Sequence, residues 1–488
     1  MTGAGPILGL LVLVPIAAAV IPVLSADRFP NMGWRISTMT LAILAACAVL
    51  ISVIGTPGPR IRYEVGTIPA AYGIELVWDG ISGMLVAVTL LVILGATVHT
   101  RRAEPRSNRF HAGLLLLTGG VIGILLAGDL FNLYVFLELT AIATYALIAT
   151  ADHRRSTYAA YKYLLLGTFG ASVYLLGVAY VFVATGTLNM ARLATAVASV
   201  GYADPVIIAS FVFISVGLAI KIALVPFHTW LPDAHATAPD AISAVISGLL
   251  PAIAVYALAR ILFTVYGIEF LQANPILLQT ILGAGVLSVL AGSVFALLQT
   301  KLKLLLAYST IAHVGLAVIG LGIANERAMF GALYHLVGHG IMKAALFLAV
   351  GLIALGYGAT TLADYEGLGQ RSPVLAGAIA GLALGLIGLP PTIGFTGKWY
   401  LALGAIEAGS WLIAAIVIGS TLLTLAYMAP IIDRLFFGQR ADPIPDRSAV
   451  PRDSLLVVIL AVAIAVGLGI VTVWIEGLLE PSIMELLQ

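Results

Sequence analysis

The sequence predicts an all-α polytopic membrane protein with about 14 transmembrane helices. Of its 488 residues, 61% are apolar and only 10% are charged, and the mean hydropathy is +1.08. Ordinary soluble chains carry about 25% charged residues, because a folded exterior needs polar groups facing water. The composition therefore excludes a water-soluble enzyme, a nucleic-acid binder and a disordered scaffold, and it makes the lipid bilayer the first partner. The net charge of +1 indicates no other partner.

Long apolar runs place the predicted helices. A spanning helix needs about 20 mainly apolar residues, whereas the strands of a membrane barrel are short and alternating. Runs of the helical kind lie near residues 5–24, 36–55, 76–99, 112–127, 130–150, 161–184, 205–230, 240–265, 277–299, 304–324, 329–356, 374–398, 410–437 and 454–475. No Lys or Arg precedes Arg28, so we expect the first run to be a helix, since a signal peptide has a basic start.

The basic residues predict the orientation of these helices. Sixteen of the 24 Lys and Arg residues lie in odd-numbered loops and five lie in even-numbered loops. Because Lys and Arg concentrate in cytoplasmic loops, we expect the odd-numbered loops in the cytoplasm and both termini outside. The three remaining basic residues fall inside predicted spans and are Lys221, Lys343 and Lys398.

The sequence contains no motif that predicts a cofactor or a metal site. Iron–sulfur clusters need several cysteines, and Cys47 is the single cysteine. His335 and His339 are four residues apart, but Leu336 stands where a zinc protease needs Glu. We therefore expect no cofactor and no metal, and no enzymatic activity of the chain by itself.

Glu138 is the first candidate for proton chemistry. It lies in the middle of the run 130–150, with Tyr134 four residues earlier on the same helix face. An ionisable residue at the bilayer centre costs at least about 2.5–3.5 kcal/mol, so its presence indicates a function. Glu138 is thus a candidate to load and release a proton, and the alternative is a structural ion pair between helices.

Two proline breaks accompany the lysines inside the membrane. Pro226 follows Lys221, and the pair Pro390-Pro391 precedes Lys398. Proline breaks a helix, and a broken helix at membrane depth is tolerated where it lines a cavity or lies buried in protein. Two such breaks in matching positions predict a repeat transporter with sites near the membrane midplane, and we place its halves at helices 4–8 and 9–13. The alternatives are a simple kink with a snorkelling lysine and a chance recurrence.

A polar stripe is predicted on the helix between the two breaks. His335, His339 and Lys343 recur at four-residue steps, which keeps them on one helix face. Histidines titrate near neutral pH and suit a proton relay. His313 is a neighbouring candidate, although a single buried histidine is more often a satisfied core residue.

Further polar residues lie toward the predicted cytoplasmic side. Lys162 begins the sixth helix and is either a proton-transfer residue or a positive-inside anchor. A second group follows the break in helix 7, and we expect it to form either a proton entrance or solvated loop groups. Its members are His228, Asp233 and His235.

Several motifs resemble those of the antiporter-like membrane subunits shared by complex I, membrane-bound hydrogenases and Mrp cation/proton antiporters. They are Gly128-Asp-Leu-Phe-Asn-Leu-Tyr-Val-Phe-Leu-Glu138, Lys221-x4-Pro226-Phe-His-x-Trp-Leu-Pro-Asp-Ala-His235, Leu306-Ala-Tyr-Ser309 and Gly388-x-Pro-Pro-x-x-Gly-Phe-x-Gly-Lys398. The resemblance covers helices 4 to 13. The Asp129–Glu138 version of the first motif favours the D-type component of Mrp antiporters or its hydrogenase counterpart.

The resemblance implies two inverted five-helix repeats with broken helices 7 and 12, and a proton path along the membrane midplane. It places the proton-translocating positions of the family on Glu138, Lys162, Lys221, Lys398 and the stripe of the eleventh helix. The predicted division of the chain is then residues 1–110 for helices 1–3, 111–270 for the first repeat, 271–440 for the second, and 441–488 for a loop and helix 14.

One departure from the family pattern affects the proton path. The family usually has a lysine in helix 8, and this chain has Ala252 there, directly after Pro251. The central link of the usual proton wire is therefore missing. Water, His313 or the stripe around His339 can bridge it, or the subunit serves as a non-conducting spacer.

The resemblance implies a proton-translocating subunit of a multi-subunit Mrp-type Na+/H+ antiporter in a prokaryotic plasma membrane. Its expected partners are other membrane subunits, protons and Na+. The alternative is a membrane-arm subunit of a redox-driven proton pump of the hydrogenase, formate or NADH/quinone type. The redox centres would then lie in partner subunits, so the sequence leaves both open.

Overall fold

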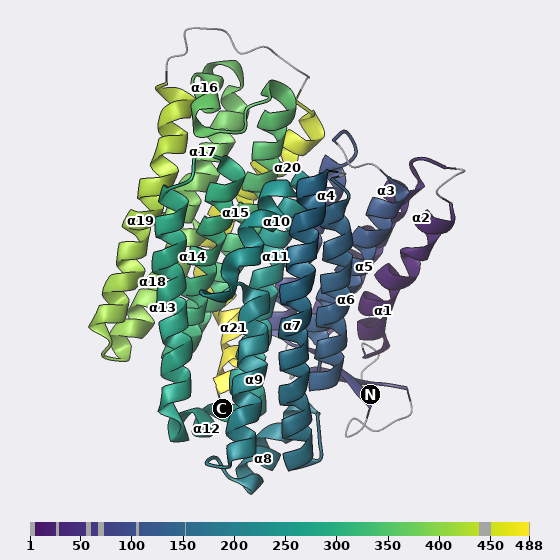
Figure 1. Cartoon of the computed structure of the whole chain (residues 1–488), viewed down its shortest axis with the longest axis vertical. Coiled ribbons are helices and arrows are strands. Elements are labelled where there is room, and N and C mark those ends of the chain that lie inside the picture. The colour runs from purple at the N-terminus through teal and green to yellow at the C-terminus, as the bar shows by residue number, and fades with distance from the viewer. Residues whose placement is uncertain are drawn as a thin grey trace.

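A computed structural model describes residues 5–25, 29–54, 60–66, 73–103, 107–151, 153–438 and 450–487. The described chain is a bundle of long helices that run along one common direction (Figure 1). Thirteen described segments are long and apolar enough to cross a membrane, judged by length and composition. The bundle confirms the predicted fold class of a polytopic all-α membrane protein.

The helices up to the middle of the chain follow the predicted runs within a few residues, except that α7 begins at Arg154, so the prediction that Lys162 begins this helix is wrong. Their bounds are α1 Gly5–Ala18, α2 Val20–Leu24, α3 Met32–Ile54, α4 Gly80–His99, α5 Asn108–Leu126, α6 Leu130–Ala149, α7 Arg154–Thr185, α8 Met190–Val200, α9 Pro205–Ile222, α10 Trp230–Thr237 and α11 Asp240–Ala259. The pairs α1–α2 and α9–α10 each count as one candidate span. The amphipathic helix α8 was not predicted, because it is too short to span a membrane.

The second half of the chain continues the bundle. Its helices are α12 Gly267–Ala273, α13 Pro275–Leu297, α14 Leu302–Ile323, α15 Glu326–Tyr357, α16 Leu368–Arg371, α17 Pro373–Ile387, α18 Ile393–Glu407, α19 Trp411–Phe436, α20 Arg452–Ile470 and α21 Thr472–Leu487. A π-helical turn at Arg260–Tyr266 joins α11 to α12. The predicted twelfth span is the broken pair α17 and α18, whose pieces are each 15 residues long. With this pair, the thirteen continuous candidates become the predicted fourteen.

Glycines let the helices around the first break approach closely. A Cβ atom on Gly217 of α9 would lie 2.7 Å from the backbone oxygen of Gly170 on α7. In the second half, a Cβ atom on Gly331 of α15 would lie 2.6 Å from the backbone nitrogen of Leu401 on α18. Small residues at such crossings allow backbones in a membrane bundle to pack tightly. These contacts hold each broken helix against its neighbour.

Two isolated backbone bridges occupy matching places in the two halves. Asp129, just before α6, pairs with Asn189, which follows α7. Lys301, just before α14, pairs with Thr361, which follows α15. In both places, the residue before one helix is therefore tied to a residue that follows the next helix.

A β-hairpin that the sequence did not reveal connects α3 to α4. Its strands β1 Ile61–Val65 and β2 Ile74–Trp78 are antiparallel, with Tyr63 opposite Leu76. The hairpin lies at the end of the bundle that also holds α8, α12 and both labelled termini (Figure 1). Four arginines used to predict the orientation lie outside the described residues, namely Arg28, Arg106, Arg440 and Arg447.

Candidate functional site

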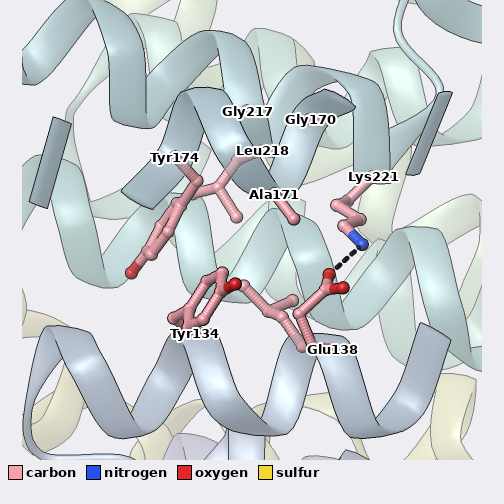
Figure 2. Close-up of a pocket in the computed structure, with 9 residues that line it drawn as sticks. Tyr134, Glu138, Gly170, Ala171, Tyr174, Gly217, Leu218 and Lys221 are labelled. Carbon is pink, nitrogen blue, oxygen red and sulfur yellow. Dashed lines mark hydrogen bonds and ion pairs between the residues drawn. The ribbon is translucent and has the colours of Figure 1, made fainter. Parts of the chain in front are cut away.

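Glu138 and Lys221 form a partly buried ion pair between α6 and α9. The Lys221 Nζ atom donates to the Glu138 Oε1 atom over 2.8 Å, and Figure 2 shows the two side chains pointing toward one another. The Lys221 side chain is 8% exposed and that of Glu138 is 21% exposed. Charge-assisted hydrogen bonds of this length are among the strongest in proteins. The pair joins the carboxylate and the lysine that the sequence analysis singled out separately.

Aromatic side chains line the pocket beside this pair. Tyr134 and Tyr174 stack with ring centroids 6.3 Å apart, and both line the pocket that Glu138 and Lys221 share (Figure 2). The Tyr174 hydroxyl donates to the Leu130 carbonyl. Tyr134 therefore lies on the face of α6 that carries Glu138, as the four-residue spacing predicts.

The first helix break places Lys221 at the end of α9. Ala223 ends this helix with φ at 63°, a left-handed conformation that residues other than glycine rarely adopt. The Trp230 indole nitrogen donates over 2.9 Å to the Ile220 carbonyl at the open end of the helix. The ring of Trp230 also stacks on Tyr163 at 3.8 Å, which fixes α10 against α7. The break therefore holds the lysine beside rigid neighbours.

Lys162 and Asp233 form a second, more exposed pair. The Lys162 Nζ atom lies 2.6 Å from the Asp233 carboxylate and donates to the Thr229 carbonyl over 2.8 Å. The side chains are 29% and 45% exposed. His228, also predicted near the entrance, is half-buried and stacks on Phe295. These groups provide a polar approach to the first helix break.

His235 lies apart from its predicted neighbours at the entrance. It is 0% exposed, and its ring stacks on Phe347 of α15 with centroids 4.7 Å apart. Its charged neighbours are Lys343 and Lys303. The helical turn of α10 explains this, because residues two apart on a helix point to different sides. Asp233 faces Lys162, and His235 faces the interior of the bundle.

Four buried histidines form what we call the histidine cluster: His235, His313, His335 and His339. The His313 Nδ1 and His335 Nε2 atoms lie 3.2 Å apart, and the rings of His313 and His339 have centroids 5.8 Å apart. Neither ring nitrogen of His339 or of His235 has a hydrogen-bond partner among the described residues. Buried polar groups in proteins are normally hydrogen-bonded. The cluster thus has free proton-accepting and proton-donating capacity in the interior.

Lys343 and Lys398 differ from Lys221 in their partners. The Lys343 side chain is completely buried, and its Nζ atom donates to the Leu306 carbonyl over 2.9 Å. The Lys398 Nζ atom donates to the carbonyls of Leu386 and Ile387, at 3.2 and 3.0 Å. These two carbonyls belong to the last turn of α17, where the second helix break leaves them free. Among the described residues, neither lysine forms an ion pair with a carboxylate.

The sequence analysis missed a charged network at the hairpin end of the bundle. Arg260 forms a buried ion pair with Asp79, which caps the start of α4. Burial opposes ionisation of Asp79, but the nearby Arg260 holds its pKa below the usual range. Asp129, which caps α6 through the Asn132 amide, has its pKa raised by burial to about 6. The sequence held a signal for this network, because Asp79 and Arg260 lie inside the predicted runs 76–99 and 240–265.

The described residues contain no group of three or more His, Cys, Asp or Glu side chains placed to hold a metal ion. The candidate site consists of two ion pairs at the first break, the histidine cluster, and two lysines held by carbonyls.

Residues 127–424 match the family described as NADH:quinone oxidoreductase/Mrp antiporter, TM. This stretch covers more than half of the chain. The chain belongs to this family. It is 38% identical over 459 residues to the N subunit of NADH-quinone oxidoreductase from Desulforudis audaxviator, covering 91% of this chain and 90% of the relative. It is 29% identical over 489 residues to the D subunit of the Na(+)/H(+) antiporter from Bacillus subtilis, covering 98% and 97%.

A solved structure shows the same likeness. A chain of the Mrp complex from Dietzia sp. DQ12-45-1b matches with a TM-score of 0.88 and 26% identity, and the match covers 100% of both chains. The protein is accordingly a multi-pass antiporter-like membrane subunit of the Mrp or complex I type, and other membrane subunits are its partners. The expected family is confirmed, while relatives from both kinds of complex match the chain.

Proposed function

We propose that the chain translocates protons as a membrane subunit of a multi-subunit Mrp-type Na+/H+ antiporter. The partly buried Glu138–Lys221 pair is the observation that carries the proposal. A carboxylate and an ammonium joined over 2.8 Å inside a membrane bundle can exchange a proton, because each group changes the charge environment of the other. Loss of the proton from Lys221 frees Glu138 and alters the field along the bundle, which couples its charge state to neighbouring subunits.

The proposed proton path begins at the pair of Lys162 and Asp233 and reaches Lys221 at the first break. Beyond it, the path crosses the position of Ala252, where the family usually has a lysine. We propose that the histidine cluster supplies the missing link. His235 lies near Lys343, and His335 lies near Lys398, so the cluster spans the interior between the two later lysines.

The full-length likeness to a D-type antiporter component supports the Mrp assignment. The alignment with the relative in Bacillus subtilis covers 98% of this chain, and the alignment with the Dietzia Mrp chain covers 100% of it. A second candidate is a proton-pumping subunit of a redox complex, and the 38% identity to an N-type component of NADH-quinone oxidoreductase favours it. Mass spectrometry of co-purifying subunits separates the two. Small membrane proteins without redox centres support the Mrp proposal, whereas nickel or iron–sulfur proteins contradict it.

A third candidate is a non-conducting spacer, which the alanine at position 252 favours. The substitution Lys398→Met tests it in the assembled complex, with Lys301→Met as the matched control at an exposed lysine. If the path reaches Lys398, the first variant loses at least about tenfold of Na+-dependent proton uptake in inverted vesicles and the control keeps it. Unchanged uptake in both variants contradicts proton transfer through this subunit.

We further propose that both termini lie outside a prokaryotic plasma membrane, with odd-numbered loops in the cytoplasm. The excess of Lys and Arg in the odd-numbered loops supports this orientation. The termini lie at one end of the bundle, opposite α16, which carries Arg371 (Figure 1). Cysteine labelling of intact cells at position 370 and at position 203 tests the proposal, which requires only the second position to react.

A further inference from the structure

A large cavity lies at the hairpin end of the bundle, away from the proton-exchanging side chains. Its volume is about 760 Å³, and it is walled by the end of α3, the hairpin, the first turns of α4 and the C-terminal helix α21. One end of the cavity is charged, with Arg60, Asp79 and Glu485. The remaining wall is mainly apolar and includes Ile51 and Leu478. The cavity is therefore amphipathic.

Arg60 is the unusual group at the charged end. Its side chain is only 10% exposed, and its Nε atom lies 3.1 Å from Glu485 and 3.5 Å from Asp79. Neither Nε nor Nη2 has a hydrogen-bond partner among the described residues. Asp79 is already engaged by Arg260. A buried guanidinium with open N–H groups calls for an additional acceptor, since burial without a hydrogen bond is costly.

The charged neighbours of Arg60 are of both signs, with Arg260 opposed by Asp79 and Glu485. Burial and the neighbouring Arg260 lower the pKa of Arg60, and the opposing attraction of Asp79 and Glu485 does not offset them. Arginine binds phosphate oxygens well, because its planar group presents several donors in a fixed geometry. A phosphate group beside Arg60 therefore fits the donors that the guanidinium leaves open.

The apolar wall extends from this point along the helices. Met84 and Ala87 of α4 face the cavity one and two turns below Gly80, and Ile475 of α21 also lines it. The distance along α4 from Gly80 to Ala87 is about 10 Å at 1.5 Å per residue. Arg60 belongs to the connection between two spans, so it lies at the depth of lipid headgroups, with the apolar wall at the depth of acyl chains.

We propose that this cavity binds one membrane phospholipid, with its phosphate on the Arg60 guanidinium and an acyl chain between α3, α4 and α21. The bound lipid ties the C-terminal helix to the hairpin end of the bundle. The phosphate accepts the N–H groups that Arg60 leaves open, and the acyl chain covers apolar side chains that water would otherwise reach. The proposal is independent of the route that protons take.

Gly477 offers a way to fill the cavity without disturbing the backbone. It lines the cavity, and a Cβ atom on it would meet nothing within 4 Å. Gly467 of α20 has the same open surroundings but does not line the cavity, so Gly467→Phe is the matched control for Gly477→Phe. For the charged end, Arg60→Gln is compared with Arg62→Gln, whose side chain is 45% exposed and belongs to another pocket.

The experiment is native mass spectrometry of the purified full-length chain, titrated with short-chain phosphatidylglycerol after delipidation. We expect the wild type and both control variants to bind one lipid, and Gly477→Phe and Arg60→Gln to bind it at least about tenfold more weakly. Circular dichroism confirms that the variants remain helical. Equal lipid binding by all five proteins would overturn the proposal.

Two further titrations identify the ligand. Inorganic phosphate and glycerophosphoglycerol carry the same phosphate chemistry without acyl chains, and we expect them to compete at least about tenfold more weakly than the lipid. Equal competition by either compound overturns the lipid assignment in favour of a free phosphate. The lipid assignment is also overturned if the wild type retains a neutral quinone or a partner peptide and Gly477→Phe does not.

Discussion

Separating Glu138 from Lys221 tests the physical basis of the proposed function most directly. At 2.8 Å and an effective dielectric of 20, two unit charges attract by about 6 kcal/mol. Desolvation cancels much of this attraction, but removing one partner of a buried pair still costs about 3–5 kcal/mol, because it leaves an uncompensated charge. Both side chains are less than a third exposed. We therefore expect Glu138→Gln and Lys221→Met each to destabilise the protein by about this amount.

The double variant Glu138→Gln/Lys221→Met removes both charges together. We expect it to unfold at a higher temperature than either single variant, since no isolated charge remains in the bundle. Transport should behave differently. All three variants should lose at least about tenfold of Na+-dependent proton uptake in inverted vesicles, because the exchanging groups are gone.

An exposed ion pair serves as the control. Arg327 and Glu407 lie 2.9 Å apart with side chains 51% and 45% exposed. Surface pairs contribute only about 0–1 kcal/mol. Arg327→Met and Glu407→Gln should therefore change neither thermal stability nor proton uptake appreciably. Unchanged uptake in Glu138→Gln and Lys221→Met, at normal amounts of assembled complex, would refute the role of the partly buried pair.

Three other substitutions have expected outcomes that can be measured on the same purified protein. Lys343→Met should reduce proton uptake but keep or raise the melting temperature. The Leu306 carbonyl still accepts from the Thr310 hydroxyl, and no carboxylate is left unpaired. A large loss of stability would contradict this expectation. Ala252→Lys should lower the melting temperature, because position 252 is only 3% exposed. It should not increase proton uptake, because the histidine cluster carries the proposed path. A gain in proton uptake would show that the lysine was the missing link. Asp129→Asn keeps the helix cap but cannot ionise. Because burial raises the folded-state pKa of Asp129 from 3.8 to about 6, its charge costs stability above pH 6, and this cost fades as the pH falls toward 4. The variant should therefore gain most in melting temperature at pH 8 and little at pH 4, and an equal gain at both would be inconsistent with the shift.

The sequence was sufficient to find the spans and the charged residues within them. An ionisable group inside a membrane is rare enough to stand out, so Glu138, Lys221 and Lys398 could each be recognised from a single sequence. The structure pairs Glu138 with Lys221, two residues that the sequence analysis named separately. The proline breaks were equally readable, since proline cannot continue a helix without losing a hydrogen bond.

The remaining features depend on contacts that leave no local signal. The Leu306 carbonyl that holds Lys343 is a backbone group, and any residue type supplies one. The side to which His235 points depends on how α10 turns after the break, and the polar residues around it looked equally accessible in the sequence. The hairpin was missed because its first strand reads as a charged loop and its second as the start of an apolar run.

The two halves of the bundle hold their lysines in different ways. Removing a lysine is therefore expected to affect protein stability in the first half more than in the second. In the first half, Lys162 and Lys221 each face a carboxylate, so removing either lysine leaves an unpaired negative charge. In the second half, Lys343 and Lys398 face only carbonyls among the described residues, so removing either lysine leaves no unpaired charge. When either lysine is protonated, no carboxylate in the described chain forms an ion pair with its positive charge. Any counter-charge must then come from another part of the assembly. In the proposed path, the first half therefore holds a charge and the second half passes it on.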